Sequence, residues 1–572
     1  MAGGTNLAAG IYNVKKEENI EATHMTYNPE GEAITDGGYA DTGIDWGENG
    51  VGIDGMWVMS NYPNLLWVAV NGKIKYADIS TEPESSAVVY EADPAIALTA
   101  GNAVFFRDYR GVLYFTNGVN NMGRISVGRL AENITGASTD FDLEAGDTSR
   151  FTDGVDKLYI QGDEIDYNGW TVDTVDSVTN IATNHADGAY VTQYNTISAP
   201  PSGSLKARCM AIFRDTMWYI PVDEPNVLRY GKTVSSVSTF ANIHDFSDGN
   251  NYLIGSAGEL TALLDSGQDR LYVFTKDKTY YIGIEVTSAA VEAFSPDRLF
   301  TGNYGCPNPF CVAEMEGVVV VFTGKRIIRF GYEPTINQIL PDEKFDEEIF
   351  PVLTTAANYS QDNARVAYSS RNKKFLLTIN ISGVLRTAIY DNRLDKYSYS
   401  FGHDPSCYVI NDGALYFGSR ADDVVYKFGE DIDADGFALE HALVTGRLDN
   451  KSRNRKFWRR GVVEGRIARG TTISFSIKIN GTAVGNIRQI TDTVADLTDT
   501  GEQLGSDIVG MTTVGGGGDT VSLYKFRFPF SVGARGEDIQ FEWSSLGEGA
   551  AWSISKWQVD GIEFEELPYT HY

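Results

Sequence analysis

The amino-acid sequence predicts an all-β protein, in which a β-propeller of six to eight blades precedes a C-terminal β-sandwich. Three observations lead to this fold class. Aromatic residues make up 12% of the chain and 59 of its 572 residues are glycine, a pairing of strand formers with turn formers. Short apolar runs separated by polar turns recur along the chain. Helical patterning is confined to two short segments, 285–298 and 337–350.

The repeated unit is a β-hairpin, and it is clearest in two segments, DRLYVFTKDKTYYIG (269–283) and GVVVVFTGKRIIRFG (317–331). Each has a run of β-branched and aromatic residues, a polar turn and a second apolar run that ends at glycine. This is the pattern of an antiparallel hairpin. Similar segments occur at 65–78, 111–118, 156–170, 215–231, 373–391 and 413–429.

A single hairpin of this kind is not stable alone. About four large apolar side chains contribute roughly 2 kcal/mol each on burial, whereas ordering each residue costs on the order of 1–2 kcal/mol in backbone entropy. Each hairpin must therefore stack on similar neighbours, which is the arrangement of a β-propeller. We assign the propeller to residues 41–430 and an N-terminal arm or partial blade to residues 1–40. A pair of β-sandwiches with hairpin-rich edges is the alternative.

Residues 431–572 have a different character and predict a separate β-sandwich. Segments such as TTISFSIKING (471–481) and EDIQFEWSSLG (537–547) alternate between apolar and polar residues, as half-buried strands do. Between them, residues 499–519 contain four consecutive glycines, which predicts a long mobile loop near this position. No Lys-Ser or Lys-Thr follows these glycines, so a phosphate-binding loop is not expected.

Charge and cysteine content exclude several classes of protein. The chain carries 47 Lys and Arg against 77 Asp and Glu, a formal net charge of −30, which disfavours tight binding of duplex DNA or RNA. This charge fits simple solubility, and it also fits a surface past which nucleic acid slides. Four scattered cysteines form no zinc motif. Neither a signal peptide nor a membrane-spanning stretch is evident, so we expect synthesis in a cytoplasm and no membrane insertion.

The sequence contains no recognisable enzyme motif. The six histidines have no metal-ligand spacing, and neither a HExxH motif nor a Gly-x-Ser-x-Gly elbow occurs. A pair of carboxylates is uninformative in a chain with 77 acidic residues. We therefore expect no catalytic residues and no obligate cofactor.

One acidic turn resembles part of a calcium-binding loop. Asp431, Asp433 and Asp435 alternate and are followed by Gly436, so their carboxylates can converge on one hard cation. The bidentate acid of a complete loop is missing, since Ala442 stands at that position. A solvated Asp-Gly turn is the competing interpretation. These three aspartates are the candidate Ca²⁺ ligands, and no other cofactor is expected.

A basic strip, KSRNRKFWRRGVVEGRIARG (451–470), follows the acidic turn. Its cations alternate with Phe457 and Trp458, as in some nucleic-acid contacts. In a chain with a net charge of −30, the favoured interpretation is a strand whose cations meet acidic surface of the same chain or of a neighbour. Lys456, Arg459 and Arg460 are therefore the candidate subunit-interface residues.

The order of three segments resembles the tail hub or nozzle proteins of short-tailed bacteriophages, which are also called head–tail stabilisation proteins. These segments are PNVLRYGKTVSSVSTFANIHDFSDGNNYLIGSAGELTALLDSGQDRLYVFTKDKTYYIG (225–283), GCPNPFCVAEMEGVVVVFTGKRIIRFG (305–331) and DADGFALEHALVTGRLDNKSRNRKFWRRGVVEG (433–465). The resemblance covers most of residues 40–470 in pattern and order. The last 100 residues add little to it.

The resemblance implies a virion structural protein that forms a homo-oligomeric, sixfold ring around the DNA exit channel. It implies contacts with the adaptor and portal complex on one side and with tail fibres or a distal plug on the other. The ring would seal packaged double-stranded DNA and pass it during ejection without binding it specifically. The sequence does not indicate which residues line the channel. A carbohydrate-binding or carbohydrate-hydrolysing propeller of a phage tail, acting as a receptor-binding spike, is the alternative function.

Overall fold

The structure is a computed structural model, and it describes residues 19–563 apart from short internal segments. The residues left out between these limits are 24, 28–32, 36–37, 81–82, 146, 148–149, 152–156, 171–173, 202, 233–242, 248, 255–257, 267–269, 287–291, 295–297, 300–303, 334–337, 343–344, 347–362, 382–383, 394, 402–403, 429–438, 446, 448–455, 469, 492–497, 505–520 and 548–551.

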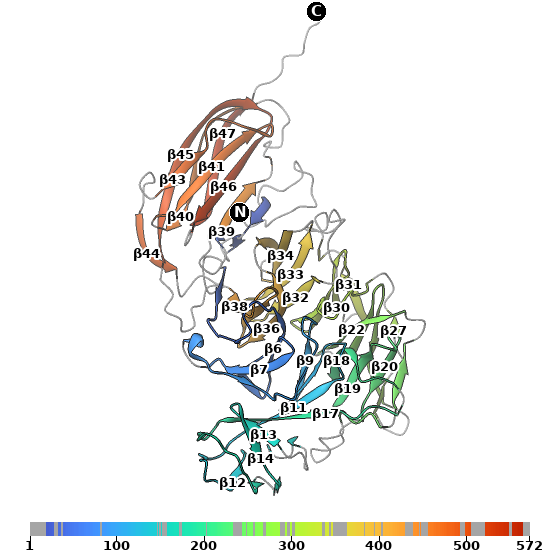
Figure 1. Ribbon diagram of the computed structural model, residues 1–572. Helices are drawn as coiled ribbons and strands as arrows, with labels where there is room; N and C mark the ends of the chain where they lie inside the picture. The colour runs from blue at the N-terminus through green and yellow to red at the C-terminus, as the bar shows by residue number, and fades with distance from the viewer. Residues whose placement is uncertain are drawn as a thin grey trace, which may run out of the picture.

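The protein is almost entirely β-structure, as the sequence predicts. Antiparallel sheets succeed one another along the chain (Figure 1). In the described residues, the single helical element is a 3-10 turn at Glu84–Ser86. None of the described helical structure is long and apolar enough to cross a membrane.

Seven antiparallel sheet units of four strands each occupy the described residues 39–428, and together they are called the seven-sheet unit. The first four are β5 (Ile53–Met59), β6 (Tyr62–Val70), β7 (Lys73–Asp78) and β8 (Val89–Glu91); β9 (Phe105–Tyr109), β10 (Val112–Thr116), β11 (Gly123–Arg129) and β17 (Tyr190–Thr196); β18 (Ala207–Phe213), β19 (Thr216–Pro221), β20 (Val227–Tyr230) and β21 (Asn251–Leu253); and β22 (Leu260–Ser266), β23 (Arg270–Thr275), β24 (Thr279–Ile282) and β27 (Arg298–Leu299). The last three are β28 (Val312–Met315), β29 (Val318–Phe322), β30 (Ile327–Glu333) and β31 (Gln338–Asp342); β32 (Arg365–Ser369), β33 (Lys374–Ile381), β34 (Val384–Asp391) and β35 (Lys396–Phe401); and β36 (Pro405–Asn411), β37 (Ala414–Ser419), β38 (Val425–Phe428) and β4 (Tyr39–Asp41).

The first strand of each sheet contacts the first strand of the next sheet. These contacts join β5 to β9, β9 to β18, β18 to β22, β22 to β28, β28 to β32 and β32 to β36. Because β36 also contacts β5, the contacts between first strands lead back to the first sheet, and they are called the circle of strand contacts. Separate apolar clusters fill the spaces between neighbouring sheets, including the space between the seventh sheet and the first, where Val409 and Val68 share one cluster.

The hairpins predicted at 269–283 and 317–331 are confirmed. Strands β23 and β24 pair Phe274 with Thr279, and β29 and β30 pair Phe322 with Ile327. Their central residues are buried on both faces of the strand, since each sheet has a neighbour on either side. This explains why these strands are written as continuous apolar runs instead of alternating ones.

One predicted hairpin, at 156–170, does not start a four-stranded sheet of its own. The hairpin at 156–170 forms β13 (Lys157–Ile160) and β14 (Asp163–Asp166), which extend the second sheet beyond β17. Together with β12 (Asp140–Asp142), β15 (Gly169–Trp170) and β16 (Thr174–Asp176), they form an insert between β11 and β17. The insert lies at the end of the molecule opposite the C-terminal strands (Figure 1).

The N-terminal strands are distributed between two parts of the fold. Strand β4 pairs with β38 and completes the seventh sheet, and beside it Thr42 Oγ1 donates a hydrogen bond to the Val425 carbonyl oxygen at 2.9 Å. Strands β2 (Met25–Tyr27) and β3 (Ala33–Thr35) instead join a C-terminal sheet through β47 (Trp552–Glu563). Strand β1 (Asn19–Thr23) lies between β35 and β39 (Leu439–Thr445).

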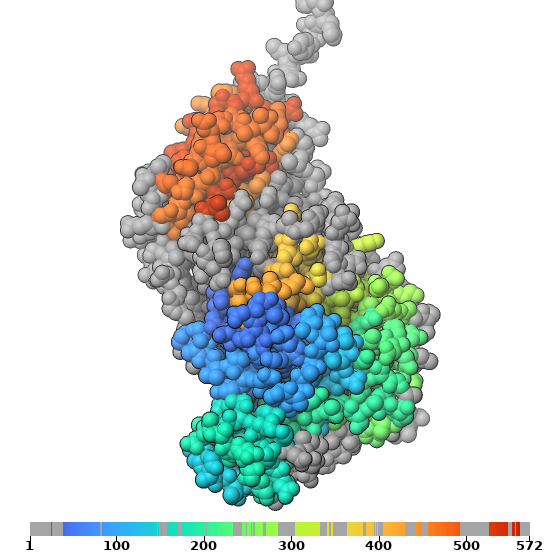
Figure 2. Space-filling view, in the orientation of Figure 1, coloured from blue at the N-terminus to red at the C-terminus, as the bar shows by residue number. Residues whose placement is uncertain are grey.

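The C-terminal strands form two sheets that share an apolar core, here called the C-terminal sheet pair. One has the strands β1-β39-β46-β41-β42, which continue the sixth sheet beyond β35 so that, with β43 paired to β41, ten strands form one sheet. The other has the order β2-β3-β47-β40-β45-β44. The core between them includes Trp458, Phe475 and Trp543, which are fully buried. Figure 2 shows these strands, in orange to red, gathered in a lobe of their own. The remaining bounds are β40 (Lys456–Ala468), β41 (Thr472–Ile479), β42 (Thr482–Ala483), β43 (Arg488–Thr491), β44 (Thr498–Leu504), β45 (Val521–Gly536) and β46 (Ile539–Gly547).

The structure corrects the two helix predictions. Residues 338–342 form strand β31, paired with β30, and strands β25 (Ile284–Val286) and β26 (Glu292–Phe294) occupy the other segment. In both places strand pairing, of β31 with β30 and of β25 with β26, overrode weak local helical preference. The predicted loop near 499–519 begins as strand β44, and residues 505–520 lie outside the described residues. The domain division at 40/41 and 430/431 stays a prediction.

Gly55, in the first strand of the first sheet, allows the first and second sheets to approach closely. A Cβ atom at Gly55 in β5 would lie 2.4 Å from the Val104 carbonyl oxygen, next to the second sheet. Such a contact is far shorter than van der Waals distance, so a side chain here would push the first and second sheets apart. This glycine therefore serves packing between sheets and not a turn.

Candidate functional site

A cavity of about 150 Å³ lies among the first strands of several sheets. It is called the central cavity, and its walls come from β5, β9, β32, β36, the start of β28 and the residues just before it. These strands belong to the first, second, fifth, sixth and seventh sheets, so the cavity lies inside the circle of strand contacts. The side chains that define its chemistry are Trp57, Phe105, Arg107, Phe310, Arg365 and Tyr408.

Two arginines and two phenylalanines form a continuous row in the wall of the cavity. The Arg107 guanidinium lies 4.4 Å from the centre of the Phe105 ring and 5.1 Å from that of Trp57. The centres of Phe105 and Phe310 are 5.8 Å apart, and the Arg365 guanidinium lies 4.4 Å from Phe310. Each cation therefore rests on an aromatic face, which compensates part of the cost of its burial.

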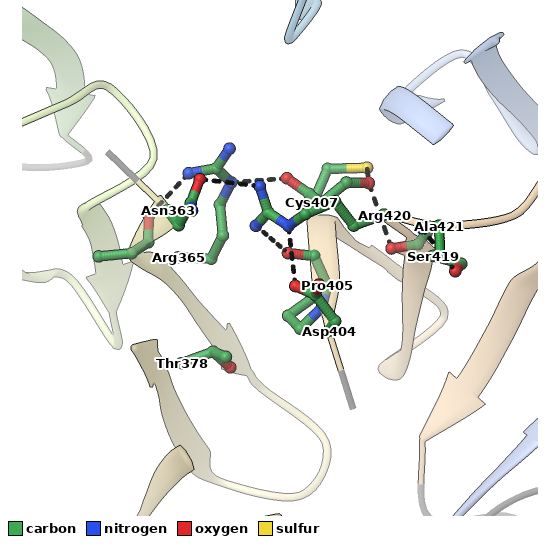
Figure 3. Close-up of polar contacts among 12 residues, drawn as sticks. Asn363, Arg365, Thr378, Asp404, Pro405, Cys407, Ser419, Arg420 and Ala421 are labelled. Atoms are coloured by element: carbon green, nitrogen blue, oxygen red, sulfur yellow. Dashed lines mark hydrogen bonds and ion pairs between the residues drawn. The ribbon is translucent and has the colours of Figure 1, made fainter. Parts of the chain in front are cut away.

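Arg365 is held by backbone carbonyls and is only 5% exposed. Its Nε donates to the Ser406 carbonyl oxygen at 2.5 Å and its Nη1 to the Ala364 carbonyl oxygen at 2.9 Å. Figure 3 shows a second arginine, Arg420, beside it. Arg420 is paired through Nε with Asp404 at 2.8 Å. Two guanidinium groups therefore lie close together here, that of Arg365 in the wall of the cavity and that of Arg420 outside its lining.

The cavity environment disfavours positive charge on its arginines. Burial, and then the nearby Arg420, lower the pKa of Arg365 to about 10. Burial also lowers the pKa of Arg107, and Asp265 opposes this effect electrostatically. Arg365 stays charged at neutral pH, since its pKa of about 10 lies well above 7. Arg107 is surrounded by protein atoms, but its side chain is partly exposed and lines the cavity.

Asp54 lies on β5, two residues before the cavity residue Met56. Its Oδ2 accepts a hydrogen bond from the Gly101 backbone amide at 3.2 Å. Burial raises its pKa from 3.8 to about 6, and the Gly101 amide opposes the shift. The folded protein therefore keeps a proton on this carboxyl to a higher pH than the unfolded chain does.

We expect Asp54→Asn to stabilise the protein near neutral pH. Between pH 3.8 and about 6 the folded state binds more protons at Asp54 than the unfolded state, so stability falls as pH rises through this interval. An amide does not ionise and keeps an oxygen for Gly101. After a discount for solvent screening, the gain at pH 7.5 is about 1–2 kcal/mol. Urea unfolding at pH 7.5 and pH 4 measures it.

The gain should disappear at pH 4, where the wild-type carboxyl is already protonated in the folded state. Asp187→Asn, at an exposed site in the insert, is the matched control and should change stability little at either pH. A gain of equal size at both pH values, or a loss at pH 7.5, contradicts the prediction.

A second feature is a cationic sheet face on the C-terminal sheet pair. It is defined by the exposed side chains of Arg459, Arg460, Arg527, Arg535 and Lys556 on β40, β45 and β47. Arg460 and Arg527 are 77% and 70% exposed, and they lie 3.5 Å from Asp560 and 3.2 Å from Glu464. Cations thus outnumber carboxylates among the described side chains of this face, on a chain whose net charge is −30.

The structure separates the three predicted interface residues. Lys456 is only 2% exposed, and its Nζ donates to the Glu537 carbonyl oxygen at 3.3 Å. Arg459 and Arg460 are exposed, at a register shift where β40 bulges against both neighbouring strands. Of the three predicted interface residues, only Arg459 and Arg460 are therefore accessible to a neighbouring chain.

The predicted Ca²⁺ ligands Asp431, Asp433 and Asp435 lie outside the described residues. Within the part of the chain that the structure describes, no group of three His, Cys, Asp or Glu side chains is placed to hold a metal ion. All four cysteines are buried as free thiols. Burial raises the pKa of Cys209 to about 12 and that of Cys407 to about 11, which leaves too little thiolate at neutral pH for nucleophilic chemistry.

The sequence did not reveal the central cavity. Its polar residues, Arg107 and Arg365, are more than 250 positions apart and belong to no local motif. The one available signal was an arginine directly after the apolar residues of a first strand, as in FFRDY at 105–109. Without the order and spacing of the sheets, that signal does not say which strands meet.

Comparison with known proteins adds no assignment. No protein-family model matches the chain, and no curated protein matches it. Among solved structures, a protein from Lactobacillus plantarum is similar over 66% of this chain and 99% of its own, with 10% identity and a TM-score of 0.30. Hsv2 of Kluyveromyces lactis is similar over 62% of this chain and 98% of its own, with 8% identity and a TM-score of 0.24.

Proposed function

We propose that this chain is a ring-forming structural protein of a short-tailed phage tail, a hub or nozzle that surrounds the DNA exit channel. In this proposal the seven-sheet unit is a seven-bladed β-propeller and the C-terminal sheet pair is a β-sandwich. The return of the strand contacts from β36 to β5 supports closure of the propeller. So does the seventh sheet, which combines three late strands with the early strand β4, a common way to close a ring of blades.

The DNA channel in this proposal lies between chains and not through the centre of one chain. Phe105 and Phe310 come from the second and fifth sheets, and their rings meet with centres 5.8 Å apart. Rings in contact across the middle of the circle leave no space there for a double helix. A passage for DNA therefore needs several copies arranged around a shared axis.

The cationic sheet face is the observation that carries the ring proposal. Arg460 and Arg527 stand largely in solvent on a chain with a net charge of −30. In a closed ring, each copy can place this face against the acidic surface of the next copy, so the contact is heterologous and repeats around the axis. The acidic surface that remains would keep DNA from adhering while it moves.

The partners in this proposal follow from the resemblance given by segments 225–283, 305–331 and 433–465. They are the adaptor and portal complex on one side and fibres or a distal plug on the other, in the virion. The role is mechanical: the ring seals packaged DNA and later lets it pass. No catalytic group is assigned.

Electron microscopy of the purified chain, together with light scattering after size exclusion, tests the proposal. A sixfold ring with a central hole wide enough for a DNA duplex is the expected result. A chain that stays monomeric at tens of micromolar, or that releases sugar from bacterial envelopes, speaks against it. Sugar release would favour the receptor-binding spike instead.

We expect Arg460→Glu, alone and with Arg527→Glu, to weaken ring assembly. Each change replaces attraction to the neighbouring acidic surface with repulsion, and we expect at least a tenfold loss of affinity between copies, about 1.4 kcal/mol. Light scattering over a range of protein concentrations measures the shift from ring to monomer. Raised salt should weaken the wild-type ring in the same direction.

Lys325→Glu is the control for the charge change itself. Lys325 is exposed in the turn between β29 and β30, and the substitution alters the net charge equally. It should leave the ring intact. Rings of unchanged size and affinity in the doubly substituted protein would remove the cationic sheet face from the interface.

A further inference from the structure

We propose that the central cavity binds a small organic carboxylate with an apolar body about as large as a benzene ring. The inference is independent of ring assembly, because the cavity lies inside one chain. A cavity of about 150 Å³ matches the size that accepts benzene in an engineered protein core. Its location among first strands of five sheets makes it part of the fold and not of a surface loop.

The anionic part of the ligand follows from Arg107. Its Nη1 donates to the Phe106 carbonyl oxygen at 2.9 Å, and no carboxylate among the described residues lies within ion-pair distance of it. Its Nε and Nη2 have no acceptor in the described part of the chain. A guanidinium offers a planar pair of donors that matches the two oxygens of a carboxylate, so a ligand carboxylate completes the bonding of this side chain.

The charge around the cavity is mixed, so Arg107 itself must place the ligand carboxylate. Arg365 is repelled by the nearby Arg420 and attracted by Asp404. Asp265 and Asp108 act on Arg107 electrostatically, but neither of these described residues forms an ion pair with it, so its free donors stay available to a ligand carboxylate.

The apolar part of the ligand follows from the rest of the lining. Trp57, Phe310 and Tyr408 present aromatic surface, and Met56 and Val366 present aliphatic surface. A fully hydrated ion such as phosphate would lose water here without finding polar partners for all its oxygens. A carboxylate on a ring or short branched chain keeps its charge at Arg107 and buries its body against this surface.

Calorimetric titration with benzoate tests the proposal in the full chain. Benzamide, which is neutral and of the same shape, and inorganic phosphate, which lacks an apolar body, are the comparison ligands. Saturable binding of one benzoate per chain is expected, with at least tenfold weaker binding of benzamide and of phosphate. Arg107→Gln should weaken benzoate binding at least tenfold, because it removes the charge-assisted hydrogen bonds.

The control Lys325→Gln removes an exposed cation outside the cavity and should leave benzoate affinity unchanged. Val366→Phe, which fills the cavity without altering its charge, should abolish binding and serves as the second variant if Arg107→Gln does not fold. Circular dichroism and thermal unfolding verify that each variant is folded. Absence of saturable benzoate binding, equal affinity for benzamide or phosphate, or unchanged affinity in a folded Arg107→Gln or Val366→Phe protein overturns the proposal.

Discussion

Removal of residues 1–41 is expected to destabilise the protein by more than about 5 kcal/mol. The deletion takes Met25 out of the core of the C-terminal sheet pair, where it is fully buried. It also removes Tyr39, whose ring meets Phe417 and Tyr426 at 5.2 and 5.0 Å. Loss of a buried methionine costs about 2–5 kcal/mol, and each aromatic pair adds about 0.5–1.5 kcal/mol. Urea unfolding followed by tryptophan fluorescence measures the loss.

A deletion of residues 1–18, which removes none of the described strands, is the matched control and should unfold close to the wild-type midpoint. Met25→Ala and Tyr39→Ala divide the effect between the C-terminal sheet pair and the seventh sheet, and they remain informative if the long deletion is insoluble. An unchanged urea midpoint for the long deletion would show that strands β2 to β4 contribute little to stability.

Trp543→Ala is expected to cost about 3–5 kcal/mol. Trp543 is fully buried; it stacks on Phe475 and packs against the tilted ring of Phe541, with ring centres 5.6 and 5.8 Å away. Alanine leaves a cavity at the middle of the C-terminal core, whereas Trp543→Phe keeps most of the contacts and should cost much less. Calorimetric unfolding of the two variants beside the wild type measures both effects.

The same experiment tests the predicted domain boundary at 430/431. Trp218→Ala makes a comparable cavity in the third sheet, where Trp218 stacks on Tyr230 at 4.7 Å. If the two parts unfold separately, each alanine variant lowers a different transition. A single transition that both variants lower equally would show that the seven-sheet unit and the C-terminal sheet pair unfold as one unit.

The sequence was most informative where structure is local. A hairpin such as 317–331 contains both of its strands and its turn within fifteen residues, so apolar runs and turn residues are enough to predict it. The all-β class followed from the repetition of this unit. The two helix predictions failed because both segments pair as strands, Gln338–Asp342 with β30 and Ile284–Val286 with Glu292–Phe294. Local composition does not report this pairing.

Features that depend on distant pairing were not predictable from the residues alone. Strand β4 is three residues long, too short for a periodic signal, and its partner β38 lies almost four hundred positions later. Arg107 and Arg365 meet the same cavity only because the first strands of their sheets converge. The basic strip was visible as composition, but burial of Lys456 beside exposed Arg459 depends on the bulge in β40.

The placement of β4 constrains the order of events during synthesis on the ribosome. Thr42 bonds to Val425 across a separation of 383 positions, so the earliest part of the seventh sheet waits for nearly the last. Until residue 428 has emerged, β4 has no strand partner, and the apolar face of the first sheet that packs against the seventh stays exposed. Closure of such distant contacts is slow, and open strand edges invite pairing with other chains. The seven-sheet unit can therefore close only when translation is almost finished, and misassembly would start between nascent chains on crowded polysomes.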